Sequence, residues 1–291
     1  MKIVVASGIG DFSWAWSKLC QLNCEFHVGI AQTGGPLRLV QLLDLLPKVK
    51  WHSKVPMSFA QLRQLGIPSP TTIVGLDQIW RERGVVYTEA NTHIETGNRI
   101  ETWIPEIPID YHYDINIPQQ YVDTALAFMV ESPFVVLYTS QIVTSTTWGG
   151  WLPPQWVQFM DLLRKKVGDI SFVLVGAAWD VDMAMQIEAQ VKPLHIKFHN
   201  LVNKLHLGST LHLMNLAKYT VAFPSGIAVL TDVIYAPATM FWPKVLPHIN
   251  MVGKFADPES ISSGRFHETF FCTPQVLVDY IVDGYKLADK L

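Results

Sequence analysis

The sequence opens with MKIVVASGIGDFSWAWSKLC, residues 1–20, and this stretch sets the architecture expected of the chain. Lys2 to Ala6 has the apolar character of a buried strand, residues 7–10 form a turn of small residues, and a helix is expected to open at Asp11. A strand, a glycine turn and a helix in this order form a crevice at the carboxyl edge of a parallel sheet. The glycines of the turn, Gly8 and Gly10, would let the backbone approach a ligand closely.

Asp11 is the only ionisable residue of this turn. The N-terminal end of a helix dipole favours a negative charge, so the position suits a carboxylate that only stabilises the helix start. It suits a functional carboxylate at the crevice equally well. The turn by itself leaves both interpretations open.

The composition indicates a cytoplasmic protein with one large domain or two smaller ones. The 291 residues suit two domains of about 100–150 residues. No apolar run approaches the ~20 residues of a membrane span, and no signal peptide is recognisable. The three cysteines lack zinc spacing and are expected to be reduced. The net charge of −3 gives no general case for nucleic-acid binding, although Lys48, Lys50, His52 and Lys54 form a local basic cluster.

Strands and helices alternate in two series along the chain. The second series restarts at Phe134 to Tyr138 and ends in an expected last strand at Thr239 to Trp242. This pattern predicts an α/β protein with two Rossmann-like domains facing each other across a cleft. We expect an N-terminal domain over residues 1–130, a C-terminal domain over 131–272, and a C-terminal helix at 273–291. Some of the ten tryptophans are expected to be exposed in the cleft.

Residues 88–118 are rich in polar residues and proline, which is typical of a binding loop or a passage between domains. The charged residues of this segment are interpreted as a solvated surface. They are Glu89, Glu95, Arg99 and Glu101.

Two loops of the second series could hold an anion. Ser225 and Gly226 lie between a strand and a helix, where backbone N–H groups and a hydroxyl favour a phosphate. The loop after Tyr138 adds the hydroxyls of Thr139 and Ser140, with Gly149 for close approach. A dinucleotide site is disfavoured, because the second strand does not end in an acidic residue and the opening turn lacks the third glycine.

These motifs resemble glycosyltransferase family 9, the heptosyltransferase-like proteins with a GT-B fold. The G-x-G-D turn at Gly8 to Asp11 is similar to the family's first strand–turn–helix, in which the aspartate is the proposed catalytic base. Trp151 to Trp156 resembles a K-x-W-P segment, although no lysine is present. Gly176 and Asp180 resemble a G-x-x-x-[DE] turn, and Ser225-Gly226 falls on a D-[ST]-G-x-x-H loop. That loop has Pro224 and Val229 where the family has aspartate and histidine.

The resemblance implies an inverting glycosyltransferase that needs no metal and no cofactor beyond its nucleotide-sugar donor. Asp11 would be the catalytic base, and the C-terminal helix at 273–291 would pack back on the N-terminal domain. The acceptor, a glycan, a lipid-linked sugar or a nucleic acid, would bind the N-terminal domain at Gly8, Gly10, Trp14, Gly34 and Gly35. The donor would bind the C-terminal domain at residues 139, 140, 149, 176, 180, 225 and 226.

Two alternatives remain at this stage. Small proteins of this type also resemble bacteriophage glycosyltransferases that modify hydroxymethylated bases of DNA. The basic cluster with Arg63, together with the aromatic residues, would suit an extruded base. The third possibility is a nucleotide-sugar-binding protein without turnover, because the family's lysine, aspartate and histidine are missing.

Overall fold

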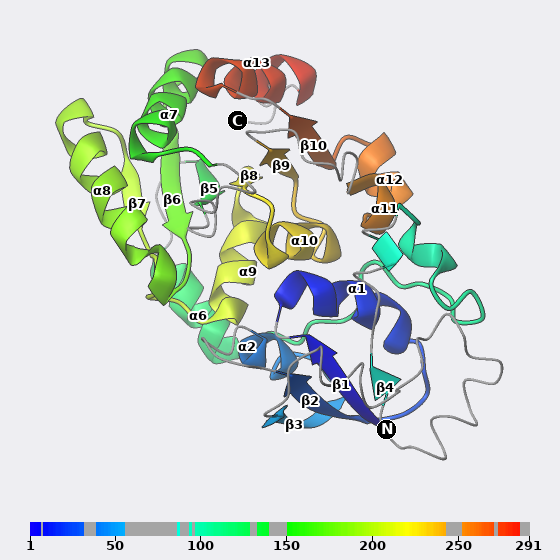
Figure 1. Ribbon diagram of the computed structural model, residues 1–291. Helices are drawn as coiled ribbons and strands as arrows, with labels where there is room; N and C mark the ends of the chain where they lie inside the picture. Colours follow the sequence, from blue (N-terminus) through cyan, green and yellow to red (C-terminus); the bar gives the residue numbers. More distant parts are fainter. Residues whose placement is uncertain are drawn as a thin grey trace. The chain divides into compact units, whose positions relative to one another are not determined.

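The chain folds into two compact α/β units (Figure 1). The computed structural model describes residues 1–6, 8–31, 39–55, 86–87, 93–94, 97–128, 133–139, 150–242, 252–270 and 273–285. The N-terminal unit comprises Met1–Asn116 with Gly253–Phe255, and the C-terminal unit comprises Ile117–Val252 with Ala256–Leu291. The first division of the chain therefore falls after residue 116, and not after residue 130 as expected from the sequence.

The N-terminal unit contains a parallel sheet in the order β3-β2-β1-β4. Its strands are β1 (Lys2–Ala6), β2 (Phe26–Ala31), β3 (Val49–Val55) and β4 (Val86–Tyr87). Helix α1 (Ile9–Leu19) follows β1, and the short helices are α2 (Val40–Leu43) and η2 (Ile100–Thr102). The apolar face of α1 is buried because Trp16 stacks on Phe12 at 5.4 Å and meets Phe26 of β2 at 5.0 Å.

A buried lysine anchors the segment that follows η2 to helix α1. Lys18 is only 2% exposed, and its Nζ donates to the carbonyl oxygens of Glu101 at 2.7 Å, Ile104 at 3.3 Å and Ile107 at 2.7 Å. Burial lowers the pKa of this ammonium group. The three carbonyls replace the water that the ammonium group loses, so they make its burial tolerable.

The C-terminal unit contains a six-stranded parallel sheet in the order β10-β9-β8-β5-β6-β7. This is the doubly wound Rossmann order, in which the strand sequence reverses direction between β5 and β8. The strands are β5 (Phe134–Tyr138), β6 (Ser171–Val175), β7 (Phe198–Asn200), β8 (Tyr219–Ala222), β9 (Ala238–Trp242) and β10 (Phe266–Phe270). The fold class of an α/β protein with two Rossmann-like units is thus confirmed.

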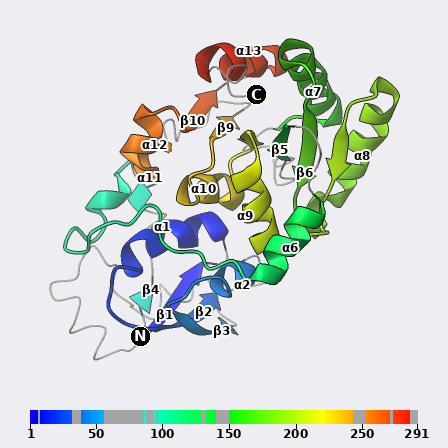
Figure 2. The same ribbon diagram turned by 180° about the vertical axis from the view of Figure 1, so that it is seen from behind.

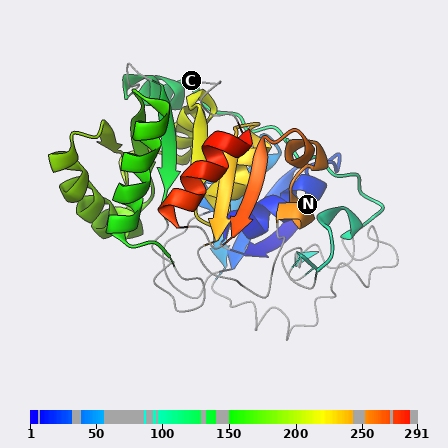
Figure 3. The same ribbon diagram turned by 90° about the horizontal axis from the view of Figure 1, so that it is seen from above.

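Helices cover this sheet. They are α6 (Gln119–Ala127), α7 (Pro153–Val167), η4 (Ala178–Asp180), α8 (Val181–Val191), η5 (Lys192–Leu194), α9 (Leu207–Leu216), α10 (Gly226–Val233), α12 (Pro258–Ser262) and α13 (Pro274–Tyr285). The short helix α11 (Val252–Phe255) is divided, with Val252 in this unit and Gly253–Phe255 in the N-terminal unit. Helices α7 and α13 lie side by side in both opposite views (Figures 1 and 2), and α13 crosses the sheet strands in Figure 3. Leu277 and Ile281 of α13 belong to the core that α7 shares.

The described residues 273–285 therefore pack in the C-terminal unit, whereas the sequence led us to expect packing on the N-terminal domain. The expectation that some tryptophans would be exposed holds for Trp51 among the described residues, whereas most of the other described tryptophans are buried. Five of these rings are at most 3% exposed, and Trp51 alone exceeds half exposure. The five are Trp16, Trp103, Trp151, Trp156 and Trp242. Within the described ranges, no helix has the length and apolarity that a bilayer crossing requires.

Candidate active site

Asp11 lies at the carboxyl end of β1, where the order of the first sheet reverses between β1 and β4. Helix α1 begins at Ile9, two residues before the expected start, and Gly8 is its N-cap. Asp11 is therefore the third residue of the helix and is not the capping residue. Its half-buried carboxylate lies in the first turn, where the helix dipole stabilises a negative charge.

The Asp11 carboxylate lies so close to Gly8 that a side chain at position 8 would collide with it. The Gly8 φ of −78° is ordinary for any residue, so backbone freedom is not the reason for glycine here. A Cβ at this position would lie 2.5 Å from Asp11 Oδ2. The glycine therefore leaves room for the Asp11 side chain above the turn.

The Gly8→Ala substitution is expected to lower activity more than stability. The added methyl must displace the end of one flexible side chain, which costs little folding free energy, but that side chain is Asp11. A catalytic group displaced by about 1 Å can lose on the order of 100-fold in rate. Parallel measurements of transfer rate and thermal unfolding check this expectation. A loss of stability with an unchanged transfer rate in Gly8→Ala would contradict it.

The predicted acceptor residues are only partly described. Gly10 lies in the first turn of α1, and Trp14 lies one turn beyond Asp11. The Trp14 ring packs on Phe255 at 5.3 Å between centroids. Gly34 and Gly35 lie outside the described residues, so their role stays a prediction.

In the C-terminal unit, the described donor-site candidates Thr139, Ser225 and Gly226 follow β5 and β8, the two strands between which the strand order reverses. Phe223 N donates to Tyr138 O at 3.0 Å, which aligns the ends of β8 and β5. Ser225 caps α10, because its Oγ accepts a hydrogen bond from Ala228 N at 3.2 Å. Gly226 begins this helix, so its first backbone N–H groups and the positive end of the dipole lie at the carboxyl edge of the sheet.

Thr139 follows β5 directly and is 1% exposed. Its Oγ1 is buried and has no hydrogen-bond partner in the part of the chain that the structure describes. A buried hydroxyl without a partner costs free energy, so it suits a position where a ligand completes the bond. Ser140 and Gly149 lie outside the described residues, and their predicted role remains open.

The Gly176–Asp180 turn after β6 repeats the packing of the first turn. A Cβ on Gly176 would lie 2.8 Å from Asp180 Oδ2, and this oxygen accepts a hydrogen bond from Ala177 N at 2.9 Å. Asp180 is 1% exposed, whereas Asp182 is exposed in the first turn of α8. The role of Asp180 and Gly176 in donor binding stays a prediction.

The basic cluster of the N-terminal unit is largely engaged by the chain itself. Lys48 Nζ donates to Cys20 O and to Leu22 O, the latter at 3.1 Å. Lys50 forms an ion pair with Glu25 at 3.1 Å, and His52 Nε2 lies 2.7 Å from Asp44 Oδ1. These contacts weaken the interpretation of the cluster as a phosphate-binding surface. Arg63 lies outside the described residues.

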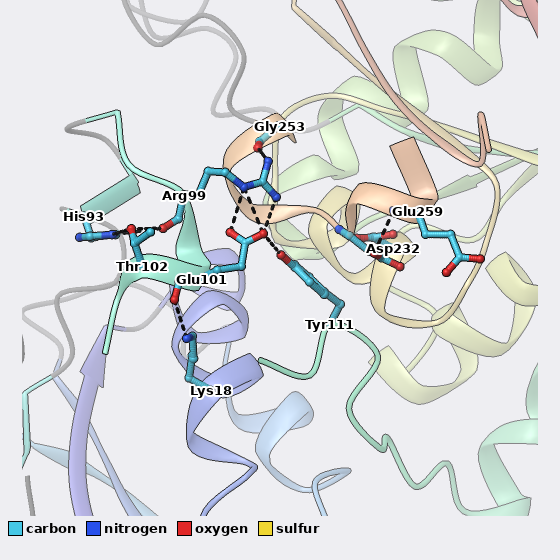
Figure 4. A network of polar contacts seen from close by, with 10 residues as sticks. Lys18, His93, Arg99, Glu101, Thr102, Tyr111, Asp232, Gly253 and Glu259 are labelled. Atoms are coloured by element: carbon cyan, nitrogen blue, oxygen red, sulfur yellow. Dashed lines mark hydrogen bonds and ion pairs between the residues drawn. The ribbon is translucent and has the colours of Figure 1, made fainter. Parts of the chain in front are cut away.

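Two of the four charged residues interpreted as solvated surface, Arg99 and Glu101, form a polar network (Figure 4), and Glu89 and Glu95 lie outside the described residues. Arg99 Nε donates to both carboxylate oxygens of Glu101 at 3.1 Å, and Tyr111 OH donates to the same carboxylate. Burial by itself would raise the pKa of Glu101, but the hydrogen bonds from Arg99 and Tyr111 outweigh it and lower the pKa. Sequence reasoning missed this network because opposite charges two residues apart are common on exposed loops.

The described residues contain no group of three or more histidine, cysteine, aspartate or glutamate side chains arranged to hold a metal ion. The two units carry different chemistry at equivalent places. The first has a carboxylate on a helix start, and the second has hydroxyls and backbone N–H groups on a helix start. Two Rossmann-like units with carboxyl-edge sites define the GT-B class of fold.

Comparison with solved structures agrees with this class over the whole chain. E. coli ADP-heptose LPS heptosyltransferase II is 13% identical, with 100% of this chain and 99% of that chain covered and a TM-score of 0.64. The glycosyl transferase family 9 protein from Veillonella parvula is 12% identical, with 98% and 89% covered and a TM-score of 0.59. E. coli heptosyltransferase WaaC with ADP is 12% identical, with 100% of both chains covered and a TM-score of 0.58.

No protein-family model matches the sequence, and no curated protein matches it. At 12–13% identity, the structural likeness establishes the heptosyltransferase-like fold that the sequence motifs predicted. The relationship to bacteriophage proteins stays a prediction.

Proposed function

We propose that this protein is a glycosyltransferase that moves a sugar from a nucleotide-sugar donor to an acceptor hydroxyl with inversion at the anomeric carbon. The observation that carries the proposal is the pair of unlike carboxyl-edge sites: Asp11 on the first turn of α1, and the α10 start beside Thr139. Each supplies a function that transfer requires. The fold shared with heptosyltransferases supports the same reaction class.

The reaction needs one base and one stabilised leaving group. Asp11 accepts the proton of the acceptor hydroxyl as its oxygen attacks the anomeric carbon. The bond between this carbon and the diphosphate oxygen breaks, and the nucleoside diphosphate leaves with the bonding pair. The N–H groups at Gly226 and the Thr139 hydroxyl stabilise the negative charge that develops there. No metal or further cofactor takes part in this scheme, and the proton on Asp11 passes to solvent.

The donor class is tested by a thermal-shift panel of nucleoside diphosphates and nucleotide sugars. A ligand that binds only the folded state raises the free energy of unfolding by about 2.7 kcal/mol when its concentration is 100 times its Kd. The unfolding temperature rises as a result. We expect at least one nucleoside diphosphate and its sugar conjugates to give such a shift. An unshifted transition with every compound would contradict nucleotide-sugar binding.

The Thr139→Val substitution is expected to separate ligand binding from stability. Valine keeps the shape and removes the unpartnered hydroxyl, so the free protein should be as stable as wild type or up to about 1 kcal/mol more stable. Affinity for the nucleoside diphosphate should fall about 10-fold, because a hydrogen bond to a charged group contributes about 1.5 kcal/mol. Calorimetric titration and chemical unfolding check the two effects. Unchanged affinity would remove Thr139 from the donor site.

A binding protein without turnover is the second candidate, and one observation favours it. Val229, which stands where the family resemblance places a histidine, is 6% exposed and part of the apolar side of α10. The position thus contributes to packing and supplies no polar group to a donor. Release of nucleoside diphosphate from any donor in the presence of wild-type protein would exclude this candidate.

A further inference from the structure

Three of the four residues of helix α11 belong to the N-terminal unit, although the helix lies between β9 and β10 in the sequence. Gly253–Phe255 are part of that unit, and Val252 before them is part of the C-terminal unit. Phe255 is 6% exposed and packs on Trp14 of α1. Arg99 Nη1 donates to Gly253 O. One aromatic and one charged contact therefore hold three residues of the second half of the sequence in the first unit.

The charged contact is itself fixed to helix α1. Arg99 is held by the Glu101 carboxylate, and the Glu101 carbonyl accepts the hydrogen bond from Lys18 (Figure 4). Lys18 and Trp14 are both residues of α1, one turn apart. Helix α11 is thus connected to α1 by two independent routes.

These contacts lie on a particular face of α1. Asp11 and Trp14 are three residues apart, so they share one face of the helix. Both are half-buried, whereas Phe12, Ser13, Ala15 and Trp16 are buried. Phe255 packs on the ring of Trp14, one helical turn from Asp11. Loss of this packing is expected to loosen the helix turn next to the carboxylate.

The preceding residue is held in the other unit. Val252 N donates to Glu268 Oε2 at 3.2 Å, and Glu268 Oε1 accepts from Trp242 Nε1 at 2.7 Å. Val252 is thus held in the C-terminal unit, and the residue that follows it belongs to the N-terminal unit.

We propose that Phe255 is a positioning residue for Asp11: by packing on Trp14 it holds the first turns of α1 in the orientation that proton abstraction requires. The inference rests on the proposed function, since it assigns Phe255 a part in that reaction. Phe255 does not touch the reacting atoms and acts through Trp14.

Hydrogen exchange of the full chain tests where Phe255 acts. In Phe255→Ala, amides of residues 9–16 should exchange at least about 10-fold faster, because a buried aromatic anchor of local structure is lost. Amides of β5 and β6 should be unchanged. Phe255→Leu, which keeps most of the volume, should give a smaller increase and guards against failure to fold. Phe128→Ala, an exposed phenylalanine of the C-terminal unit, is the control. Unchanged exchange at 9–16 in both Phe255 variants would overturn the proposal.

Steady-state transfer tests the positioning role. Phe255→Ala should lower kcat about 10-fold or more with the donor KM unchanged, and Phe255→Tyr should restore most of the rate because the ring is kept. An unchanged kcat in Phe255→Ala would overturn the role. Absence of turnover in the wild-type protein would contradict the proposed function instead, and the exchange result would then decide the inference by itself.

Discussion

Asp11→Asn is expected to lower the rate of sugar transfer by about 10²–10⁴-fold, the usual contribution of a general base. The amide is nearly isosteric with the carboxylate and keeps the first turn of α1, but it cannot accept the acceptor proton. Donor affinity should change by less than about twofold, because the donor residues belong to the other unit and the substitution removes a transition-state contribution only. Single-turnover kinetics and calorimetric donor titration measure the two quantities.

Asp182→Asn provides the matched control for this substitution. Asp182 is also an acidic residue in the first turn of a helix, α8, and it is exposed. If the carboxylate of Asp11 acted only on the helix dipole, both variants would lose about 0.3–1 kcal/mol of stability and neither would lose activity. Turnover like that of the wild type in Asp11→Asn would remove Asp11 from the mechanism.

Lys18→Met is expected to destabilise the N-terminal unit by about 3 kcal/mol, because buried carbonyls lose their charged donor. Methionine fills much of the same space but donates no hydrogen bond to the carbonyls of Glu101, Ile104 and Ile107. The loss should appear as faster hydrogen exchange in residues 97–113 and α1, with β5 and β6 unaffected. Urea unfolding gives the magnitude.

The control for Lys18 is Lys50→Met. Lys50 forms an ion pair with Glu25 in which the side chains are 53% and 66% exposed, so its loss should cost less than about 1 kcal/mol. A similar cost for the two lysines would show that the carbonyl cage contributes no more than an ordinary surface pair.

Strand bounds were predicted best where burial of an apolar run alone determined the strand. The bounds of β1 and β5 were predicted correctly, because both are short apolar runs bordered by turn residues. Strand β10 was missed because polar residues interrupt its apolar pattern. Those residues are satisfied locally: Glu268 binds Trp242 and Val252, and His267 contacts Gly264 O. Pairing with β9 then stabilises a strand that its composition does not favour.

The sequence predicted the motif residues of the candidate site but not the packing contacts that hold them in place. Gly8, Asp11, Ser225 and Thr139 could be identified because strand–turn–helix units are recognisable in a sequence. The contacts around Asp11 could not be identified. A charged residue such as Lys18 is normally exposed, and the only signal for its burial is that its α1 neighbours are almost all apolar. Phe255 is more than 200 residues from Trp14 in sequence, and no local pattern reports such a contact.

The central claim is that this chain transfers a sugar with inversion and with Asp11 as the base. The most direct measurement is NMR of the anomeric configuration of the transferred or released sugar, starting from the donor that gives the largest thermal shift. With the wild-type protein we expect a product whose anomeric configuration is opposite to that of the donor. With Asp11→Asn we expect product formation to be slowed about 100-fold or more. Retention of configuration, or equal rates for the two proteins, would contradict this claim.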